Sequence, residues 1–140
     1  MRRARGVAAV AVLGAATLAS AALASAASAR PTARTVSVQL MEMMVMPSVA
    51  TVPAGKVNFV VKNAGKLKHD FVVLKTNRPP AKLMVMGSKA MESGRIARLP
   101  AFGPGQTRRL TLTLTAGKYV LLCNVAGHYA AGMRTAFAVR

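Results

Sequence analysis

A series of short β-prone segments separated by turns constrains the fold of this chain more than any other feature. Leucine and threonine alternate in the second half of residues 107–114, which is the pattern of a strand with one buried and one solvated face. Residues 56–62 also alternate and place Val57, Phe59 and Val61 on one face. Such segments, with turn signals about every 8–12 residues, are typical of a β-sandwich rather than of alternating strands and helices.

Four further segments are predicted strands, namely residues 35–46, 70–75, 118–122 and 135–139. Pro47 closes the first of them, because proline cannot donate the hydrogen bond that a strand inside a sheet needs. Residues 78–94 show no strand alternation, and they fit either a loop or a single helical turn. A chain of 140 residues is long enough for one domain and not two. The sequence therefore predicts a single all-β domain.

The N-terminal residues have the organisation of an export signal. Three arginines precede an uncharged, alanine-rich stretch, residues 7–29, which ends in the small-residue pattern Ala-Ser-Ala. We predict that residues 1–29 are a cleaved signal peptide and that residues 30–140 form the domain. The alternative is a retained membrane anchor, because 23 uncharged residues are enough to span a bilayer. In either case the domain is expected outside the cytoplasm, in the periplasm or secreted.

The composition excludes most catalytic chemistry. Glu42, Asp70 and Glu92 are the only acidic residues, against 20 lysines and arginines, which gives a formal net charge of +17. Three carboxylates are too few for an oxygen-ligand Ca²⁺ or Mg²⁺ cage. Two histidines are too few for a three-imidazole zinc or copper enzyme site, and one cysteine excludes an intramolecular disulfide or a Cys₄ cluster. We therefore predict that the chain is not an enzyme.

The chemistry that remains is concentrated near the C-terminus. Cys123, His128 and Met133 follow one another in a C-x₄-H-x₄-M pattern, in the expected connection between two strands. A soft thiolate and an imidazole suit copper, and a second imidazole with a weak axial thioether completes the ligand set of blue-copper electron-transfer sites. His69, at the start of a predicted strand, is the only other histidine. Each of these residues could have an ordinary structural role, but together they account for one metal site.

The chain resembles the cupredoxin family of small blue (type 1) copper proteins, in the pattern of its plastocyanin-, auracyanin- and sulfocyanin-like members. The resemblance rests on residues 57–65, 68–74 and 119–133. It implies a Greek-key β-sandwich in which one histidine ligand comes from a strand and three ligands come from one loop. It also implies one copper ion, which alternates between Cu(I) and Cu(II) and is held by His69, Cys123, His128 and Met133.

Asp70 departs from the commoner pattern of this family, in which asparagine follows the first histidine ligand. We expect the Asp70 carboxylate to accept a backbone or amide hydrogen bond from the Asn124 segment and so to tie the two ligand segments together. The alternative is a solvated carboxylate that pairs with Lys68 or another nearby base.

The methionines allow a second interpretation. Seven of the nine fall in two short segments, and they are Met41, Met43, Met44, Met46, Met84, Met86 and Met91. Thioethers bind Cu(I), which would suit a periplasmic copper chaperone or buffer. Strand alternation would place Met41 and Met43 on one face and Met44 and Met46 on the other, so some of them are expected to fill the core.

The predicted function is that of an exported one-electron carrier between redox partners. The copper chaperone or buffer is the alternative, and a cupredoxin-like domain that binds without a working metal is a third. The resemblance implies that electrons pass through the exposed edge of His128, which an apolar patch surrounds. The candidates to line this patch are Leu67, Ala126, Tyr129, Ala130 and Ala131.

The charge indicates what kind of partner fits. Without residues 1–29 the chain keeps 17 basic and three acidic residues, for a net charge of +14. Such a field favours association with an acidic redox protein, such as a cytochrome or an oxidase, or with an anionic membrane surface. No nucleic-acid-binding motif is present in the sequence, so we expect no nucleic-acid partner. We expect the protein to be a monomer.

Overall fold

A computed structural model of the chain describes residues 32–140. The predicted signal peptide, and the alternative of a membrane anchor in the same segment, lie outside these residues. From residue 32 onward, no helix is long and apolar enough to cross a membrane.

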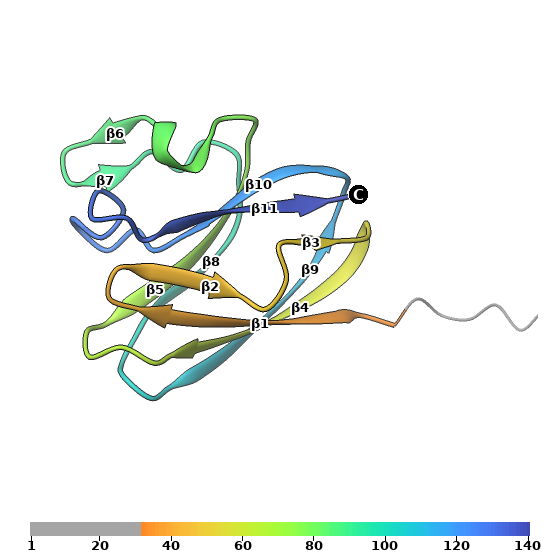
Figure 1. The fold of residues 1–140 in the computed structure, drawn as a ribbon, viewed down its shortest axis with the longest axis horizontal. Coiled ribbons are helices and arrows are strands. Elements are labelled where there is room, and N and C mark those ends of the chain that lie inside the picture. Colours follow the sequence, from red (N-terminus) through yellow and green to blue (C-terminus); the bar gives the residue numbers. More distant parts are fainter. Residues whose placement is uncertain (1–31) are drawn as a thin grey trace, which may run out of the picture.

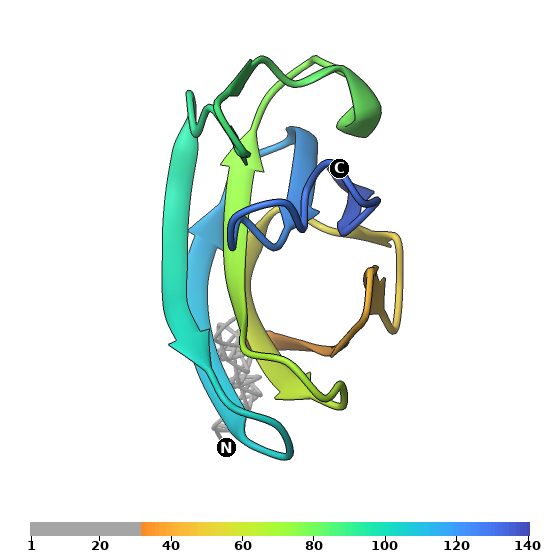
Figure 2. The same cartoon turned by 90° about the vertical axis from the view of Figure 1, so that its left-hand side faces the viewer.

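Two β-sheets pack around one core (Figures 1 and 2). The first has the strand order β2-β1-β4-β9 and the second has the order β3-β11-β10-β5-β8. The strands of the first sheet are β1 (Arg34–Met41), β2 (Met44–Pro47), β4 (Gly55–Asn63) and β9 (Thr107–Leu114). The strands of the second are β3 (Thr51–Val52), β5 (His69–Lys75), β8 (Arg95–Phe102), β10 (Gly117–Leu122) and β11 (Arg134–Val139). The predicted β-sandwich is therefore confirmed.

The connection between β5 and β8 holds the remaining elements. It contains a single 3₁₀ turn, η1 (Pro80–Lys82), and a short hairpin of β6 (Val85–Met86) and β7 (Lys89–Ala90). Residues 78–94 were predicted to be a loop or one helical turn. η1 is such a turn, but the β6–β7 hairpin in the same residues was not predicted.

The main core lies between the two sheets and contains three phenylalanines. The ring centroid of Phe59 in β4 is 5.5 Å from that of Phe71 in β5 and 5.6 Å from that of Phe137 in β11. Tilted aromatic pairs of this kind contribute about 0.5–1.5 kcal/mol beyond the burial of their surface. The cluster therefore links the first sheet to strands β5 and β11 of the second sheet.

Strand β5 is buried on both faces, which is unusual in a sandwich. One face packs in the main core, and the other packs in a second cluster made of Val72, Leu74, Leu83, Ala90, Val120, Leu122 and Tyr129. Because Leu83 and Ala90 come from the β5–β8 connection, that connection covers the outer face of β5. The continuous apolar run Phe71–Leu74 suits a strand covered on both sides. His69 and Asp70 begin this strand, and both are fully buried.

The predicted strands agree with the structure where alternating apolar and polar residues, or a turn motif, indicated their bounds. β9 coincides with the predicted residues 107–114, and β4, β5, β10 and β11 match their predicted bounds to within one residue at each end.

The prediction of one strand over residues 35–46 is wrong. The chain turns between Met41 and Met44, which lie opposite each other in the antiparallel pair of β1 and β2. The two residues of this turn are not among the usual turn formers, so the sequence did not reveal it. Within β2 the expected alternation holds, since Met44 and Met46 are exposed and Val45 is buried between them.

Strand β8 was not predicted. It contains Pro100, which argues against a strand inside a sheet. The sheet order places β8 at the edge, beside β5 only, and proline is tolerated at an edge because one side of the strand needs no partner. β8 also carries Arg98, which matters for the site described below.

Candidate metal centre

The candidate ligands meet at one end of the sandwich. His69 begins β5 and Cys123 follows β10, and these two strands are antiparallel neighbours with Leu122 opposite Val72. The start of one strand therefore lies beside the end of the other. The β10–β11 connection, the β1–β2 turn and the β6–β7 hairpin gather at this same end, on the left in Figure 1.

The donor atoms of His69, Cys123 and His128 converge. Cys123 Sγ lies 3.8 Å from His69 Nδ1 and 3.5 Å from His128 Nδ1, and the two Nδ1 atoms are 3.2 Å apart. All three donor atoms lie within 4.8 Å of one another. One sulfur and two imidazole nitrogens that face a common point fit a metal ion, and the chemistry of this donor set matches a trigonal copper site.

Backbone hydrogen bonds close the loop that carries Cys123, His128 and Met133. The Cys123 N–H donates to the Met133 carbonyl at 3.0 Å, and the Met133 N–H donates to the His128 carbonyl at 3.0 Å. Gly127 and Gly132 have φ angles of 83° and 113°, a region that favours glycine because it lacks a Cβ atom. Met133 is fully buried in the same cluster as Cys123. The loop itself thus holds the fourth predicted residue next to Cys123 and His128.

The Cys123 thiol and the His128 ring are neutral in the absence of a cation. Burial raises the pKa of the Cys123 thiol to about 12, and the negative charge of Asp70 also raises it, although a backbone hydrogen bond from Val125 acts in the opposite direction. Burial also lowers the pKa of His128, and the neighbouring His69 lowers it further. A bound metal cation would stabilise the negative charge of the Cys123 thiolate, because a thiol that coordinates a metal loses its proton.

The hydrogen bond predicted between Asp70 and the Asn124 segment is present. The Asn124 N–H donates to Asp70 Oδ1 at 2.6 Å, and Arg98 Nη2 donates to Asp70 Oδ2 at 2.6 Å. The carboxylate is fully buried, so the alternative of a solvated Asp70 is wrong, but the pairing with a base that it included is present. The base is Arg98 of β8 and not Lys68, and the sequence had not identified β8 as a strand.

The Asn124 side chain makes a second set of contacts. Its Oδ1 accepts from the Ala90 N–H at 2.9 Å, and its Nδ2 donates to the Ala90 carbonyl at 2.9 Å and to Glu92 Oε1 at 2.8 Å. These bonds attach the loop that carries Cys123, His128 and Met133, here called the ligand loop, to β7. Asn124 was predicted to act through the Asp70 contact, and this role of its amide was missed because the partners lie more than 30 residues away.

Glu42 is a further neighbour of the site that the sequence did not reveal. It lies in the β1–β2 turn, and its Oε1 is 3.2 Å from His69 Nε2. The one feature of the sequence that could have pointed to Glu42 was the scarcity of acidic residues. All three, Glu42, Asp70 and Glu92, contact His69 or Asn124 in this basic chain.

The surface beside His128 is largely apolar. His128 is 9% exposed, Leu67 is 48% exposed, and the alanines at 126, 130 and 131 are exposed. The expectation that Tyr129 lines this surface is wrong, because the residue is buried. Its hydroxyl donates to the Pro80 carbonyl at 2.7 Å and accepts from the Leu83 N–H at 3.0 Å. Tyr129 therefore anchors the ligand loop from inside.

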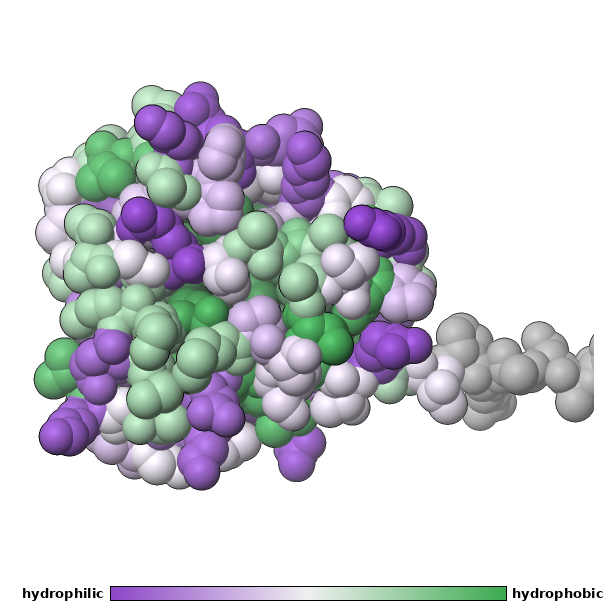
Figure 3. All heavy atoms as spheres, viewed as in Figure 1, coloured by the Kyte–Doolittle hydropathy of each residue, from purple (hydrophilic) through white to green (hydrophobic). Residues whose placement is uncertain are grey.

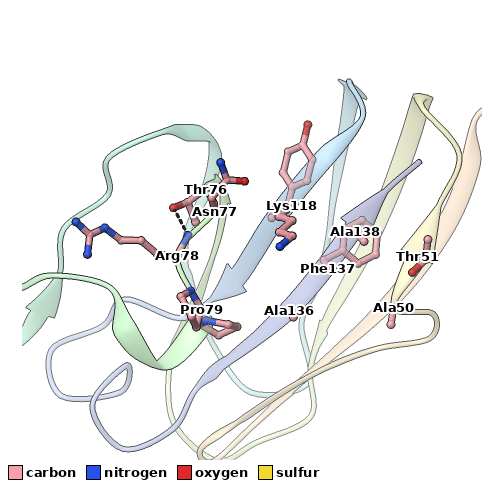
Figure 4. Close-up of a pocket in the computed structure, with 12 residues that line it drawn as sticks. Ala50, Thr51, Thr76, Asn77, Arg78, Pro79, Lys118, Ala136, Phe137 and Ala138 are labelled. Carbon is pink, nitrogen blue, oxygen red and sulfur yellow. Dashed lines mark hydrogen bonds between the residues drawn. The ribbon is translucent and has the colours of Figure 1, made fainter.

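A cavity lies away from the candidate ligands. It has a volume of about 390 Å³ and is lined by parts of β3, β10 and β11 and by residues 76–80. Figure 4 shows Lys118 of β10 and Phe137 of β11 among the side chains around it. None of the candidate ligands lines this cavity, so the metal centre and the cavity are separate features.

Comparison with known proteins agrees with this geometry. The model of the cupredoxin-like domain family matches residues 9–136. The structure is similar to auracyanin from Roseiflexus castenholzii, with 25% identity, a TM-score of 0.63 and coverage of 77% of this chain and 98% of that chain. It is also similar to auracyanin A, a "blue" copper protein from Chloroflexus aurantiacus, with 23% identity, a TM-score of 0.54 and coverage of 76% and 99%.

A third similar structure is rusticyanin from Thiobacillus ferrooxidans, with 20% identity, a TM-score of 0.52 and coverage of 78% of this chain and 79% of that chain. No curated protein matches the chain.

Proposed function

The chain belongs to the cupredoxin-like family, and we propose that it is an exported carrier of single electrons. Membership of this family of blue copper proteins brings with it the Greek-key β-sandwich and the single copper ion that the sequence resemblance implied. The observation that carries the proposal is the convergence of Cys123 Sγ with His69 Nδ1 and His128 Nδ1 in a buried cluster.

In this proposal His69, Cys123 and His128 would hold the copper ion, and the Met133 thioether would be a weaker fourth ligand. Copper supplies the Cu(I)/Cu(II) couple when it is bound. The protein's part is to keep the donors in one arrangement for both oxidation states, so that little reorganisation accompanies electron transfer. β5 is covered on both faces, and the loop is closed by its own hydrogen bonds. Both features hold the ligands in place.

We further propose that Asp70 and Asn124 stabilise this arrangement. Asp70 follows a ligand in the chain and Asn124 follows another, so the 2.6 Å hydrogen bond between them joins the two ligand segments. Partners of this kind orient the residues that bind a metal. The pairing with Arg98 satisfies the second carboxylate oxygen, which would otherwise be a buried charge without a partner.

The route for electrons is proposed to run through His128. His128 is 9% exposed, whereas His69 is fully buried, and the alanines at 126, 130 and 131 near it in the sequence are exposed. A small apolar contact of this kind forms and breaks quickly, because it contains few interactions that must be released. A carrier needs such short encounters with both its donor and its acceptor.

The basic surface is proposed to attract the partner. Lys62, Lys66 and Lys68 are exposed before β5, and Arg108 and Arg109 are exposed on β9, which pairs with β4. In Figure 3, hydrophilic side chains are distributed around the outline of the visible face with apolar residues between them. An acidic cytochrome or oxidase, or an anionic membrane surface, would be attracted by this charge. We propose that the protein acts as a monomer outside the cytoplasm, after removal of residues 1–29, and that it is not an enzyme.

Copper handling by the methionines is the second candidate function, and the exposure of several thioethers favours it. Met44, Met46, Met84, Met86 and Met91 are all exposed, with Met86 the most exposed at 71%. Methionine is often buried as a filler of irregular gaps in a core, so this exposure needs a reason. A copper chaperone or buffer would use these soft ligands for Cu(I).

An absorption spectrum of the protein loaded with one equivalent of Cu(II) separates these functions. Intense visible absorption from thiolate-to-Cu(II) charge transfer supports the electron carrier. Weak absorption together with tight Cu(I) binding supports the chaperone or buffer. A protein that binds neither ion would be a cupredoxin-like domain with another role.

A further inference from the structure

The ring of His69 has two nitrogens, and only one of them faces the other candidate ligands. Its Nδ1 faces Cys123 and His128, whereas its Nε2 lies 3.2 Å from Glu42 Oε1. His69 is fully buried, so the group at Nε2 decides how the ring is held.

The Glu42 carboxylate is itself held by the backbone. The same Oε1 accepts the N–H of Lys66 at 2.7 Å and the N–H of Leu67 at 2.8 Å. Gly65 makes room for it, because a Cβ atom at this position would lie only 2.5 Å from Oε1. The oxygen that faces His69 Nε2 is therefore one that already accepts two N–H groups, which is the geometry of an acceptor and not of a protonated hydroxyl.

An ionised carboxylate accepts hydrogen bonds and cannot donate them. The proton of a neutral His69 therefore belongs on Nε2, where it donates to Glu42. The lone pair of Nδ1 is then directed toward Cys123 and His128. The hydrogen bond made by one ring nitrogen of a histidine fixes what the other nitrogen can do.

From this geometry we propose that Glu42 is a positioning residue for copper, which fixes the tautomer of His69 and stabilises Cu(II) relative to Cu(I). The inference rests on the proposed function, since it assigns His69 as a ligand. A carboxylate on the outer nitrogen makes an imidazole a stronger donor. A stronger donor and a nearby negative charge both favour the more highly charged ion. No carboxylate lies at hydrogen-bond distance from the His128 ring within residues 32–140.

The first test replaces Glu42 with glutamine. Glu42→Gln keeps an oxygen that can accept from Lys66 and Leu67 but removes the negative charge. We expect Cu(II) affinity to fall about tenfold, the lower end of the usual loss for such outer partners, with a smaller change in Cu(I) affinity. If Cu(I) affinity is unchanged, a tenfold loss corresponds to a rise of about 59 mV in the one-electron reduction potential.

Glu92→Gln is the matched control. Glu92 contacts Asn124, Arg95 and Arg98 but neither imidazole, so this variant removes one charge near the site without touching a ligand. The proposal expects a clearly smaller rise in potential than in Glu42→Gln. Equal rises in the two variants, or no rise in Glu42→Gln, would overturn it.

The second test uses the protein without copper and separates failure of this inference from failure of the proposed function. Nitrogen-15 NMR reports which ring nitrogen of His69 carries the proton. The expected result is a proton on Nε2 in the wild-type protein, and a loss of this preference in Glu42→Ala. A proton on Nδ1 of the wild-type protein would overturn the inference whether or not the protein binds copper. A protein that has the expected tautomer but does not bind copper would contradict the proposed function and the effect on Cu(II), while the assignment of the His69 tautomer to Glu42 would stand.

Discussion

His69 and His128 present their Nδ1 atoms to the same sulfur, at 3.8 and 3.5 Å, from very different surroundings. His69 begins a strand that is covered on both faces, and its outer nitrogen faces Glu42. His128 lies in a loop, is 9% exposed and has exposed alanines near it in the sequence. One imidazole is enclosed and the other reaches the surface.

The difference separates two requirements of an electron carrier. The enclosed side can keep the geometry of the centre fixed, because buried side chains in a close-packed interior have little freedom to move. The surface side can bring the centre close to a partner without opening the fold. A site with two enclosed imidazoles would be rigid but isolated, and a site with two exposed imidazoles would be open to solvent.

The largest expected effect comes from removing the atom that both imidazoles face. Cys123→Ser should abolish the intense visible absorption of the Cu(II)-loaded protein, because a hydroxyl oxygen does not replace a soft thiolate donor. Absorption spectra of the wild-type and variant proteins at equal Cu(II) occupancy provide the measurement. If the variant kept the band, Cys123 would not be the donor.

The second prediction compares the two imidazoles directly. His128→Gly should lose the visible band and regain it when free imidazole is added, because the removed ring borders the surface. His69→Gly should regain much less of the band at the same imidazole concentration, since the removed ring lies in a closed interior. Titration of both variants with imidazole measures the difference. Equal recovery would contradict the contrast between an enclosed and an accessible ligand.

The third prediction concerns the stability of the enclosed side. Asp70→Ala leaves the Asn124 N–H without its acceptor, and a buried donor left unpaired costs about 1–3 kcal/mol. We expect a loss of that size in the free energy of unfolding of the copper-free protein, measured with urea. Asp70→Asn is the control, because its side-chain oxygen can still accept from Asn124 while the ion pair with Arg98 is lost. Its loss should be smaller, and an Asp70→Asn loss equal to that of Asp70→Ala would show that the ion pair matters more than the hydrogen bond.

The smallest expected effect concerns the surface side. Lys68→Glu should slow electron transfer to a small acidic cytochrome at low salt and leave the visible spectrum unchanged. The difference from wild type should shrink as salt rises, because screening shortens to about 8 Å at physiological ionic strength. Lys118→Glu is the control, because it makes the same charge change near the start of β10, and Cys123 follows the opposite end of that strand. Stopped-flow rates that fall equally in both variants would show that net charge, rather than charge near His69, controls association.

Sequence reasoning found the parts of this molecule that depend on local patterns. Alternation located β9 to the residue, and the spacing of Cys123, His128 and Met133 identified the loop that carries three of the proposed ligands. The β1–β2 turn was missed because its residues are not usual turn formers, and β8 was missed because of Pro100.

The contacts between distant segments could not be read from the sequence in the same way. Glu42 lies 27 residues from His69, and Arg98 lies 28 residues from Asp70. Both contacts depend on elements that were not predicted, namely the β1–β2 turn and β8. Tyr129 was placed on the surface because it follows His128 in the sequence, but its hydroxyl has two backbone partners inside the fold.

X-ray absorption at the copper edge tests the central claim most directly. The protein is loaded with one equivalent of copper, and the nearest atoms to the metal are identified by element. The account predicts one short sulfur contact together with two imidazole nitrogens, from Cys123, His69 and His128. A shell made of several thioether sulfurs without imidazole nitrogen would contradict it and would assign copper to the exposed methionines.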